Sequence, residues 1–496
     1  MGKPKLTLNS KIIDVIPDSD PESRKAWMPD QVRHDKIAVN RSPSTHVIAN
    51  LVLELWQSRL VVLLLVPIIL LALLNFLLVF TPELGFDALW YHLTIPKLWL
   101  LKHQWYFPGG LLYYSVMPRL AETIFTPLIH FTGTVGPKLV QYLAGIGTGY
   151  VIWKILENFK QTTLWKLIGV SLFYCTWLVS WQSGSAYIDL IRTFLEALAL
   201  YFCIKGSWKI GGIFLGLAIG TKWLALGTLA IYSIVFGPQI IFPAILVASP
   251  WFYLAYRFTG NPIYPLFSGL TDNSFSGIGS AFQHVLLTPW YLTKPFDDFV
   301  SPLVGLVFIL AIISLKQKNN IAGKIAVVGI LGSILTMILV PPSTRYFLPY
   351  FPALIVSVIV YLSTIKNAIY QKITFWAVIL SGFLILGLRL LAMQKYIPFL
   401  LGRVDTNTLL TSQYFRLPGI FIDADGFVAS LPKDSKIIVD KLHNLYYFPR
   451  DFDHTSWVTN FSGYDYLVTI GEDSGNIKGV LVNTNKLGIQ IFKLTK

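Results

Sequence analysis

The sequence predicts an all-α polytopic membrane protein with about eleven transmembrane helices, surface helices in its first external loop and a small C-terminal α/β domain. Two observations carry this fold class. Of the 496 residues, 54% are hydrophobic and only 13% are charged, and the mean hydropathy is +0.58, whereas soluble proteins carry roughly 25% charged residues. Apolar runs long enough to cross a bilayer fill the chain from Leu60 to Leu391, and the residues that follow are polar enough to fold in water.

These composition changes divide the chain into three parts. Residues 1–58 are polar, mixed in charge and contain several prolines, so we predict a largely disordered cytoplasmic tail with one surface helix near Val47–Trp56. A cleavable signal peptide would place a short apolar region much earlier. Residues 59–392 form the predicted transmembrane domain, and residues 393–496 form the predicted external domain.

The first span is the clearest, because Leu, Val and Ile run almost unbroken through Arg59–Phe80. The next stretch, residues 81–135, is aromatic, amphipathic and broken by proline. There we predict an external loop with helices that lie at the membrane surface over Ala88–Lys102 and Tyr113–Phe131. The alternative is that Leu111–Phe131 is a further span.

The distribution of lysines along the chain favours surface helices over a further span at Leu111–Phe131. The further spans are then residues 136–154, 163–181, 188–204, 208–222, 223–237, 240–256, 300–315, 325–341, 345–364 and 373–391. The short inner loops between them hold ten lysines and one glutamate, which satisfies the positive-inside rule. A span at Leu111–Phe131 would invert every one of those loops. The N-terminus is therefore predicted to be cytoplasmic and the C-terminus external.

The tail after Leu391 has short β-like runs separated by Asp, Asn and Gly turns, which predicts an α/β domain. The runs are Lys436–Val439, Tyr466–Ile470, Gly479–Val482 and Ile489–Leu494. Its aromatic and acidic side chains, Tyr446, Tyr447, Trp457, Asp451 and Asp453, either form a sugar-binding surface or belong to the core of the domain.

Several function classes are excluded or unsupported. Cys175 and Cys203 both fall in apolar stretches, which excludes zinc clusters and secreted disulfide scaffolds. The net charge of +14 marks membrane sidedness rather than a basic face for nucleic acid. The sequence contains no phosphate-binding Gly-rich loop and no dinucleotide fingerprint, so use of a nucleotide or an organic cofactor is unsupported.

Asp87 stands a few residues beyond the first span, among aromatic side chains. A carboxylate just above the bilayer, where aromatic rings lower the local dielectric, can act as a general base. The alternative is that Asp87 caps the helix that follows it. Tyr91, His92, Lys97 and Arg119 are further candidates in the same loop, although a lone histidine on an amphipathic helix is more often packed than functional.

Asp189 begins a later span, and Arg192 and Glu196 follow it on the same helical stripe. Charges at membrane depth usually face a bundle interior or a water-filled cavity. The three side chains either neutralise one another or contribute an acid to a site. Asp189 lies on the same side of the membrane as Asp87, so these two acids could do acid–base work or bind a divalent metal.

Lys222 and Arg345 lie at the outer ends of spans and so break the positive-inside rule. We interpret them as partners of an anion such as a phosphate, which Arg binds bidentately and Lys binds as a point charge. The alternative is that both side chains snorkel to lipid headgroups.

Several segments together resemble the GT-C glycosyltransferases, in the bacterial branch near the protein O-mannosyltransferases and the lipid A aminoarabinose transferases. The matching segments are Gly85–Lys97, Ala186–Leu190, Gly216–Lys222, Gly260–Pro265 and Arg345–Pro349, within a resemblance that covers Arg59 to Ile365. The sequence departs from the mannosyltransferases in that Ala88 follows Asp87 where they have a second acid. It also has Phe107-Pro108-Gly109-Gly110 where they have Lys-Pro-Pro.

The resemblance implies an enzyme of the bacterial inner membrane that moves a sugar from a polyprenyl-phosphate donor to a lipid, glycan or protein acceptor on the outer face. It implies that Asp87 is the base, that Asp189 supports the acceptor or a metal, and that Lys222, Arg345 and Lys97 hold the donor phosphate. Inversion at the anomeric carbon is the expected outcome of a single displacement. No role for nucleic acid is implied.

Other function classes stay open. A secondary transporter could use the charges of Asp189, Arg192 and Glu196, although the sequence shows none of the paired repeats common in transporters. An oligosaccharide polymerase or ligase could use residues 257–299 as its main external loop. A structural or assembly protein could bind a partner through its tail.

Overall fold

The computed structural model describes residues 43–268, 278–293, 300–338, 343–471 and 479–495. Its side chains are described from residue 58 onward, except those of residues 278–281. The chain divides into two units, with the boundary between Leu55 and Trp56. The predicted helix Val47–Trp56 forms part of α1 (Pro43–Val79), and the remainder of the predicted cytoplasmic tail, residues 1–42, lies outside the described residues.

Within the described residues, six helical segments are long and apolar enough to cross a membrane. They are Ser58–Val79 within α1, α4 (Val135–Asn158), Pro238–Thr259 with α10 (Ile241–Thr259), α14 (Asn320–Ile338), Thr344–Leu362 with α15 (Phe351–Leu362), and Ala368–Leu400 with α16 (Ala368–Met393) and α17 (Ile397–Leu400). Shorter apolar helices are α5 (Thr163–Tyr174), α8 (Trp208–Thr221), α9 (Ala225–Phe236) and α13 (Val304–Ser314). The remaining helices in this part are α6 (Trp177–Gln182), α7 (Asp189–Ile204), α11 (Ile278–Leu286) and α12 (Thr288–Thr293).

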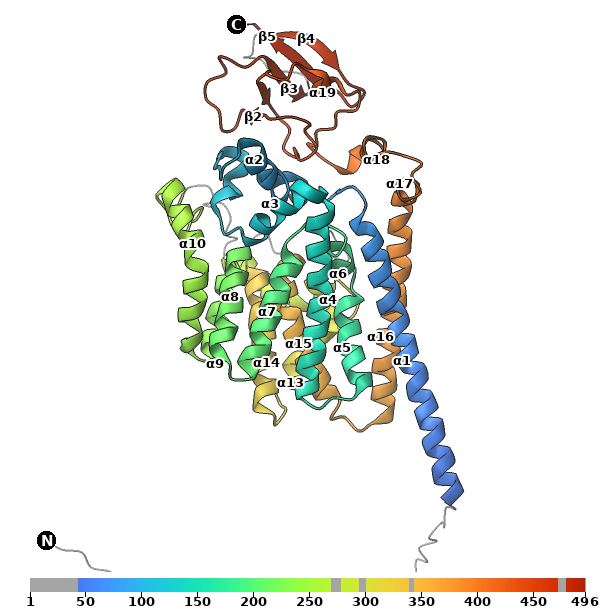
Figure 1. Cartoon of the computed structure of the whole chain (residues 1–496). Coiled ribbons are helices and arrows are strands. Elements are labelled where there is room, and N and C mark those ends of the chain that lie inside the picture. The colour runs from blue at the N-terminus through green and yellow to red at the C-terminus, as the bar shows by residue number, and fades with distance from the viewer. Residues whose placement is uncertain (1–42, 269–277, 294–299, 339–342, 472–478, 496) are drawn as a thin grey trace, which may run out of the picture. The chain divides into compact units, whose positions relative to one another are not determined.

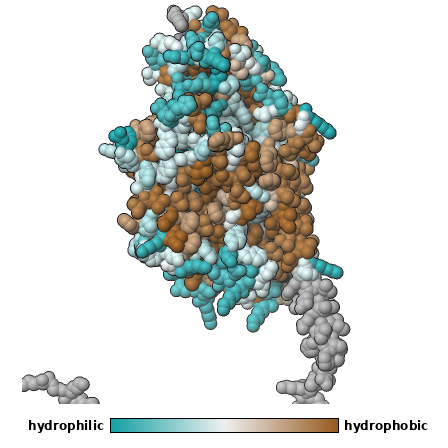
Figure 2. Space-filling model, in the orientation of Figure 1, coloured by the Kyte–Doolittle hydropathy of each residue, from teal (hydrophilic) through white to brown (hydrophobic). Residues whose placement is uncertain are grey.

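The protein is therefore a multi-pass membrane protein, and the predicted total of eleven spans stays a prediction. In Figure 1 the long helices run alongside one another, with the first-loop helices and the C-terminal sheet at one end. Figure 2 shows apolar side chains over the sides of these helices and polar side chains at both ends. That distribution is typical of a helical bundle surrounded by lipid.

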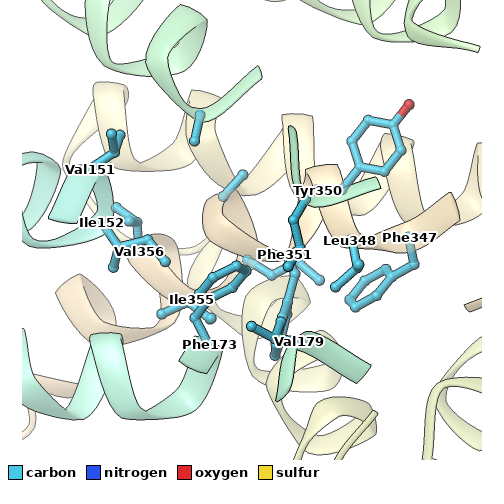
Figure 3. Packing of buried hydrophobic residues seen from close by; sticks show 14 of the residues in the cluster. Val151, Ile152, Phe173, Val179, Phe347, Leu348, Tyr350, Phe351, Ile355 and Val356 are labelled. Atoms are coloured by element: carbon cyan, nitrogen blue, oxygen red, sulfur yellow. The ribbon is translucent and has the colours of Figure 1, made fainter. Parts of the chain in front are cut away.

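The centre of the bundle is formed by α15, which is buried on nearly every side. This helix carries no charged residue and is apolar all round, as a helix must be when its neighbours cover every face. Figure 3 shows Phe173 of α5 close to Phe351 and Ile355 of α15. Ahead of α15 runs a 3-10 segment, η4 (Thr344–Tyr350), which carries Arg345.

The first loop contains four short helical segments in place of the two that the sequence predicts. They are the π-helix η1 (Ala88–His92), α2 (Thr94–Lys102), the 3-10 helix η2 (Gly110–Val116) and α3 (Leu120–Thr132). Because α3 has only 13 residues, it is not among the helices long enough to cross a membrane. The position of these helices at the membrane surface stays a prediction.

The C-terminal part contains a five-stranded sheet with the strand order β2-β1-β3-β5-β4. The strands are β1 (Ile437–Val439), β2 (Asp453–His454), β3 (Tyr466–Ile470), β4 (Gly479–Thr484) and β5 (Ile489–Leu494), and the short helices here are α18 (Thr406–Ser412) and α19 (Phe427–Ser430). β1 pairs in parallel with β2 and β3, whereas β5 pairs antiparallel with β3 and β4. The small sheet is as predicted, except for the two-residue strand β2.

The core of this sheet includes part of the first loop. Ile95, Leu98 and Trp99 of α2 belong to the same buried cluster as Phe421 and Phe448. The apolar face of α2 is thus covered by protein, and the C-terminal part packs directly on the loop that carries Asp87. The domain boundaries at residues 58/59 and 392/393 stay predictions.

Candidate active site

Asp87 forms an ion pair with Arg345, which lies 258 residues later in the chain. The distance from Arg345 Nη1 to Asp87 Oδ2 is 2.7 Å, and each side chain is 17% exposed. Asp87 occupies the N-cap position of η1, but its side chain makes no capping hydrogen bond. Its carboxylate is therefore not used in capping, and it meets a cation at a partly open position.

A second ion pair joins Asp189 to Lys222. The distance from Lys222 Nζ to Asp189 Oδ1 is 2.8 Å, and the other carboxylate oxygen accepts a hydrogen bond of 3.3 Å from Gln182 Nε2. Asp189 is the first residue of α7 and Lys222 directly follows α8, two helices that pack against each other. The Asp189 side chain is buried, whereas that of Lys222 is 17% exposed, so the cation is the accessible partner.

Two tyrosines lie against these ion pairs. The Tyr187 hydroxyl accepts a hydrogen bond of 3.3 Å from the backbone N–H of Asp87, and the Arg345 guanidinium lies 5.3 Å from the centre of the Tyr187 ring. Lys222 lies 4.8 Å from the centre of the Tyr346 ring. Asp189 is also within electrostatic range of Arg345. The structure thus brings together the four charged residues that the sequence analysis selected from distant segments.

Glu83 fixes the backbone that leads into Asp87, and the sequence analysis did not select it. One carboxylate oxygen accepts hydrogen bonds from the Gly85 N–H at 2.6 Å and from Ser185 Oγ at 2.8 Å, and the other accepts from the Ala186 N–H at 2.6 Å. A Cβ at Gly85 would lie 2.5 Å from the Tyr187 ring, so only glycine fits there. The one sequence signal is an acid directly after an apolar span.

His92 and Arg119 meet at a fourth acid, Glu122. His92 Nδ1 lies 2.6 Å from Glu122 Oε1, and Arg119 Nη1 lies 3.2 Å from the same oxygen. All three side chains are buried. Glu122 was also missed, although its position three residues after Arg119 at the start of a helix is a usable signal.

Tyr91 lies beside this group and stacks on Tyr114, with ring centres 4.4 Å apart. Burial raises the pKa of both phenols, with the negative charge of Asp87 as a further cause. Both hydroxyls therefore stay protonated near neutral pH and can donate hydrogen bonds.

Lys97 is placed away from both ion pairs. Its ammonium group donates hydrogen bonds to the backbone carbonyl oxygens of Tyr446, at 2.7 Å, and of Phe448. Burial lowers the pKa of Lys97 to about 8. A cavity of about 430 Å³ lies beside it, lined by Thr81 and several aromatic rings. The contacts hold α2 against the C-terminal part, and the predicted phosphate role of Lys97 stays a prediction.

Arg192 and Glu196 form a separate pair within α7. Arg192 Nε donates to Glu196 Oε1 at 2.6 Å, and Thr228 Oγ1 donates to the other oxygen at 2.8 Å. Both charged side chains are fully buried. The stripe predicted for Asp189, Arg192 and Glu196 is therefore divided, because Asp189 takes Lys222 as its partner.

The fit of a divalent metal depends on Asp87 and Asp189. Each carboxylate is already paired with a cationic side chain, which supplies the positive charge that a metal ion would otherwise provide. Within the described ranges, no group of three or more His, Cys, Asp and Glu side chains could hold a metal ion. A metal at these two acids stays a prediction.

Comparison with known proteins shows which solved structures share the fold of this chain. No family model matches the sequence, and no curated protein matches it. Among solved structures, ArnT from Cupriavidus metallidurans in the apo state matches with a TM-score of 0.56 and 12% identity, over 86% of this chain and 97% of that chain. ArnT from the same organism bound to undecaprenyl phosphate matches with a TM-score of 0.57 and 14% identity, over 88% and 98%. The chain therefore has the fold of ArnT, in agreement with the resemblance to the lipid A aminoarabinose transferases that the sequence shows.

Proposed function

We propose that this protein is a membrane glycosyltransferase that moves a sugar from a polyprenyl-phosphate donor to a hydroxyl group of a lipid, glycan or protein on the outer face of the membrane. The observation that carries the proposal is the pair of neighbouring acid–cation contacts, Asp87–Arg345 and Asp189–Lys222. A base for the attacking hydroxyl and a cation for the departing phosphate are the two groups that such a transfer needs. The fold supports the donor class, since one ArnT structure holds undecaprenyl phosphate.

The ion pairs suggest how the donor engages the site. Arg345 and Lys222 are each partly exposed, so a phosphate can reach both cations. A phosphate that takes a guanidinium hydrogen bond competes directly with the Asp87 carboxylate, because both are oxyanions that Arg binds with the same N–H groups. Donor binding would thus release Asp87 from Arg345 and leave its carboxylate able to accept a proton.

The transfer then follows as one displacement. The acceptor oxygen attacks the anomeric carbon while Asp87 takes its proton, and the bond from that carbon to the phosphate oxygen breaks. Arg345 and Lys222 stabilise the negative charge that collects on the lipid phosphate. Attack on the face opposite the leaving phosphate inverts the anomeric carbon. Asp189 holds Lys222 in place, and the rings of Tyr187 and Tyr346 lie against Arg345 and Lys222.

The test is transfer of radiolabelled sugar from a panel of undecaprenyl-phosphate sugars to membrane extracts, with purified wild type, Asp87→Asn and Asp434→Asn. Asp434 is an exposed carboxylate in the C-terminal part and serves as the matched control. Loss of a general base is expected to slow transfer by about 10²- to 10⁴-fold. Asp434→Asn is expected to match wild type, and all three proteins should show the same thermal unfolding.

Two outcomes would refute the proposal. Full activity in Asp87→Asn would remove the assigned base. No transfer by wild type from any donor would remove the enzyme class, and uptake of labelled solute into vesicles would then support the transporter.

A further inference from the structure

His92 ends a wide turn that begins at Asp87. The turn is a π-helix, closed by the hydrogen bond of 2.9 Å from the Leu93 N–H to the Ala88 carbonyl oxygen. Closure between residues five positions apart places His92 one turn beyond Asp87. Single π-helical turns are rare and occur frequently at functional sites. His92 is therefore carried on the same turn as the proposed base.

The hydrogen bond to Glu122 fixes the tautomer of the His92 ring. A carboxylate oxygen only accepts, so Nδ1 must carry the proton that it shares with Glu122 Oε1 at 2.6 Å. Arg119 Nη1 lies 3.2 Å from the same carboxylate oxygen. With Nδ1 protonated, the neutral form of the ring has its lone pair on Nε2, and that atom makes no hydrogen bond with any residue in the described part of the chain.

The surroundings of the ring place it at the candidate active site. The ring centre of His92 lies 4.3 Å from that of Tyr91 and 6.1 Å from that of Tyr187. Tyr187 also contacts Asp87 and Arg345. His92 is within electrostatic range of Asp189 as well. A buried ring with one nitrogen held by protein and the other unpartnered thus lies near Tyr187, which contacts the Asp87–Arg345 pair.

We propose that His92 Nε2 accepts a hydrogen bond from a substrate hydroxyl, and that Glu122 and Arg119 are positioning residues that hold the ring for this contact. The role rests on the proposed glycosyl transfer. The hydroxyl belongs either to the donor sugar or to the acceptor, since both carry this group. An acceptor atom that is cut off from water by a bound substrate and gains no partner is costly, so the site favours substrates that present a hydroxyl here.

The decisive variant is His92→Asn. The asparagine amide N–H takes the place of Nδ1–H and keeps the hydrogen bond to Glu122, but the variant has no atom in the place of Nε2. A histidine that serves only to bind Glu122 would be replaced without loss of activity per folded molecule. The matched control is His103→Asn, at an exposed residue with φ of 53°, a conformation that asparagine tolerates.

The expected result is a fall of about 3- to 10-fold in kcat/KM for His92→Asn, the size of one neutral hydrogen bond. Thermal unfolding should match wild type, as should every property of His103→Asn. A higher KM for the donor assigns the hydroxyl to the sugar, and a higher KM for the acceptor assigns it to the acceptor. Glu122→Gln, which keeps an accepting oxygen, should lose less activity than Glu122→Ala.

The tautomer is checked without any transfer assay. In ¹⁵N-histidine-labelled protein, His92→Asn should remove the signal of one ring with protonated Nδ1 and unprotonated Nε2. Loss of an Nε2–H or doubly protonated ring instead would overturn the proposal. So would wild-type kinetics in His92→Asn. Absence of transfer by wild type would refute the proposed function and this role with it. Transfer by wild type together with wild-type kinetics in His92→Asn would refute the role of His92 alone.

Discussion

The buried pair Arg192–Glu196 gives the sharpest prediction for stability. In Glu196→Gln the guanidinium of Arg192 loses its counterion at a fully buried position, where Nε and Oε1 lie 2.6 Å apart. Breaking one side of a buried ion pair costs about 3–5 kcal/mol. The double variant Arg192→Met/Glu196→Leu removes both charges and keeps the volume, a change that is often neutral. Thr228 and Tyr350 keep each other as hydrogen-bond partners in that variant, at 2.9 Å.

The assay is thermal unfolding of purified protein in detergent, together with transfer activity per folded molecule. Glu196→Gln is expected to lower the unfolding midpoint by about 3–5 °C. The double variant should recover most of that loss, and both should transfer sugar at the wild-type rate once folded. A double variant as unstable as the single one would refute the reasoning from charge. Loss of activity at normal stability would show that the pair has a functional role, as the transporter hypothesis expects.

Two further predictions concern the C-terminal part. Tyr447→Phe should lower the free energy of unfolding by about 1–3 kcal/mol, because the Tyr447 hydroxyl accepts from the Glu83 N–H at 2.8 Å and donates to the Glu83 carbonyl oxygen at 3.1 Å. The control is Tyr446→Phe, since the Tyr446 hydroxyl makes no such contact. Equal unfolding midpoints for the two variants would contradict the expectation. Burial lowers the pKa of His454 to about 4 from 6.5, so the unfolded chain binds more protons between these values and stability should fall as the pH drops from 6.5 to 4. His454→Gln should remove up to about 3 kcal/mol of that pH dependence in unfolding measured across this window, and identical pH profiles would contradict it.

The charged members of the site could be selected from sequence, but their pairing could not. Asp87, Asp189, Lys222 and Arg345 stand out because a charge beside an apolar span is costly. Helical spacing offered Arg192 as the partner of Asp189, yet Arg192 pairs with Glu196 at the next position on the stripe. Lys222 then pairs with Asp189 because α7 packs on α8, and no local pattern encodes that contact.

The first loop shows a second limit. The amphipathic pattern of α2 was interpreted as that of a helix at the membrane surface, and the structure shows that Ile95, Leu98 and Trp99 pack into the core of the C-terminal sheet. An amphipathic pattern reports that a face is covered and does not say by what. The same packing places Lys97 against the carbonyl groups near Tyr446. Four of the five strands were predicted, because their β-like runs either have five or more residues or are bounded by clear turns. β2 was not predicted, because it has only two residues.

The contact between Asp87 and Arg345 also determines when the site can form during synthesis of the chain. A chain that emerges from the ribosome at about 5–20 residues per second needs roughly 13–50 s to synthesise the 258 residues between them. During that interval Asp87 is outside its final ion pair, and Tyr447, 364 residues after Glu83, has yet to close on the loop. Assembly of the site is therefore a late event in biogenesis, and a chain interrupted before Arg345 carries the acid without the cation that completes it.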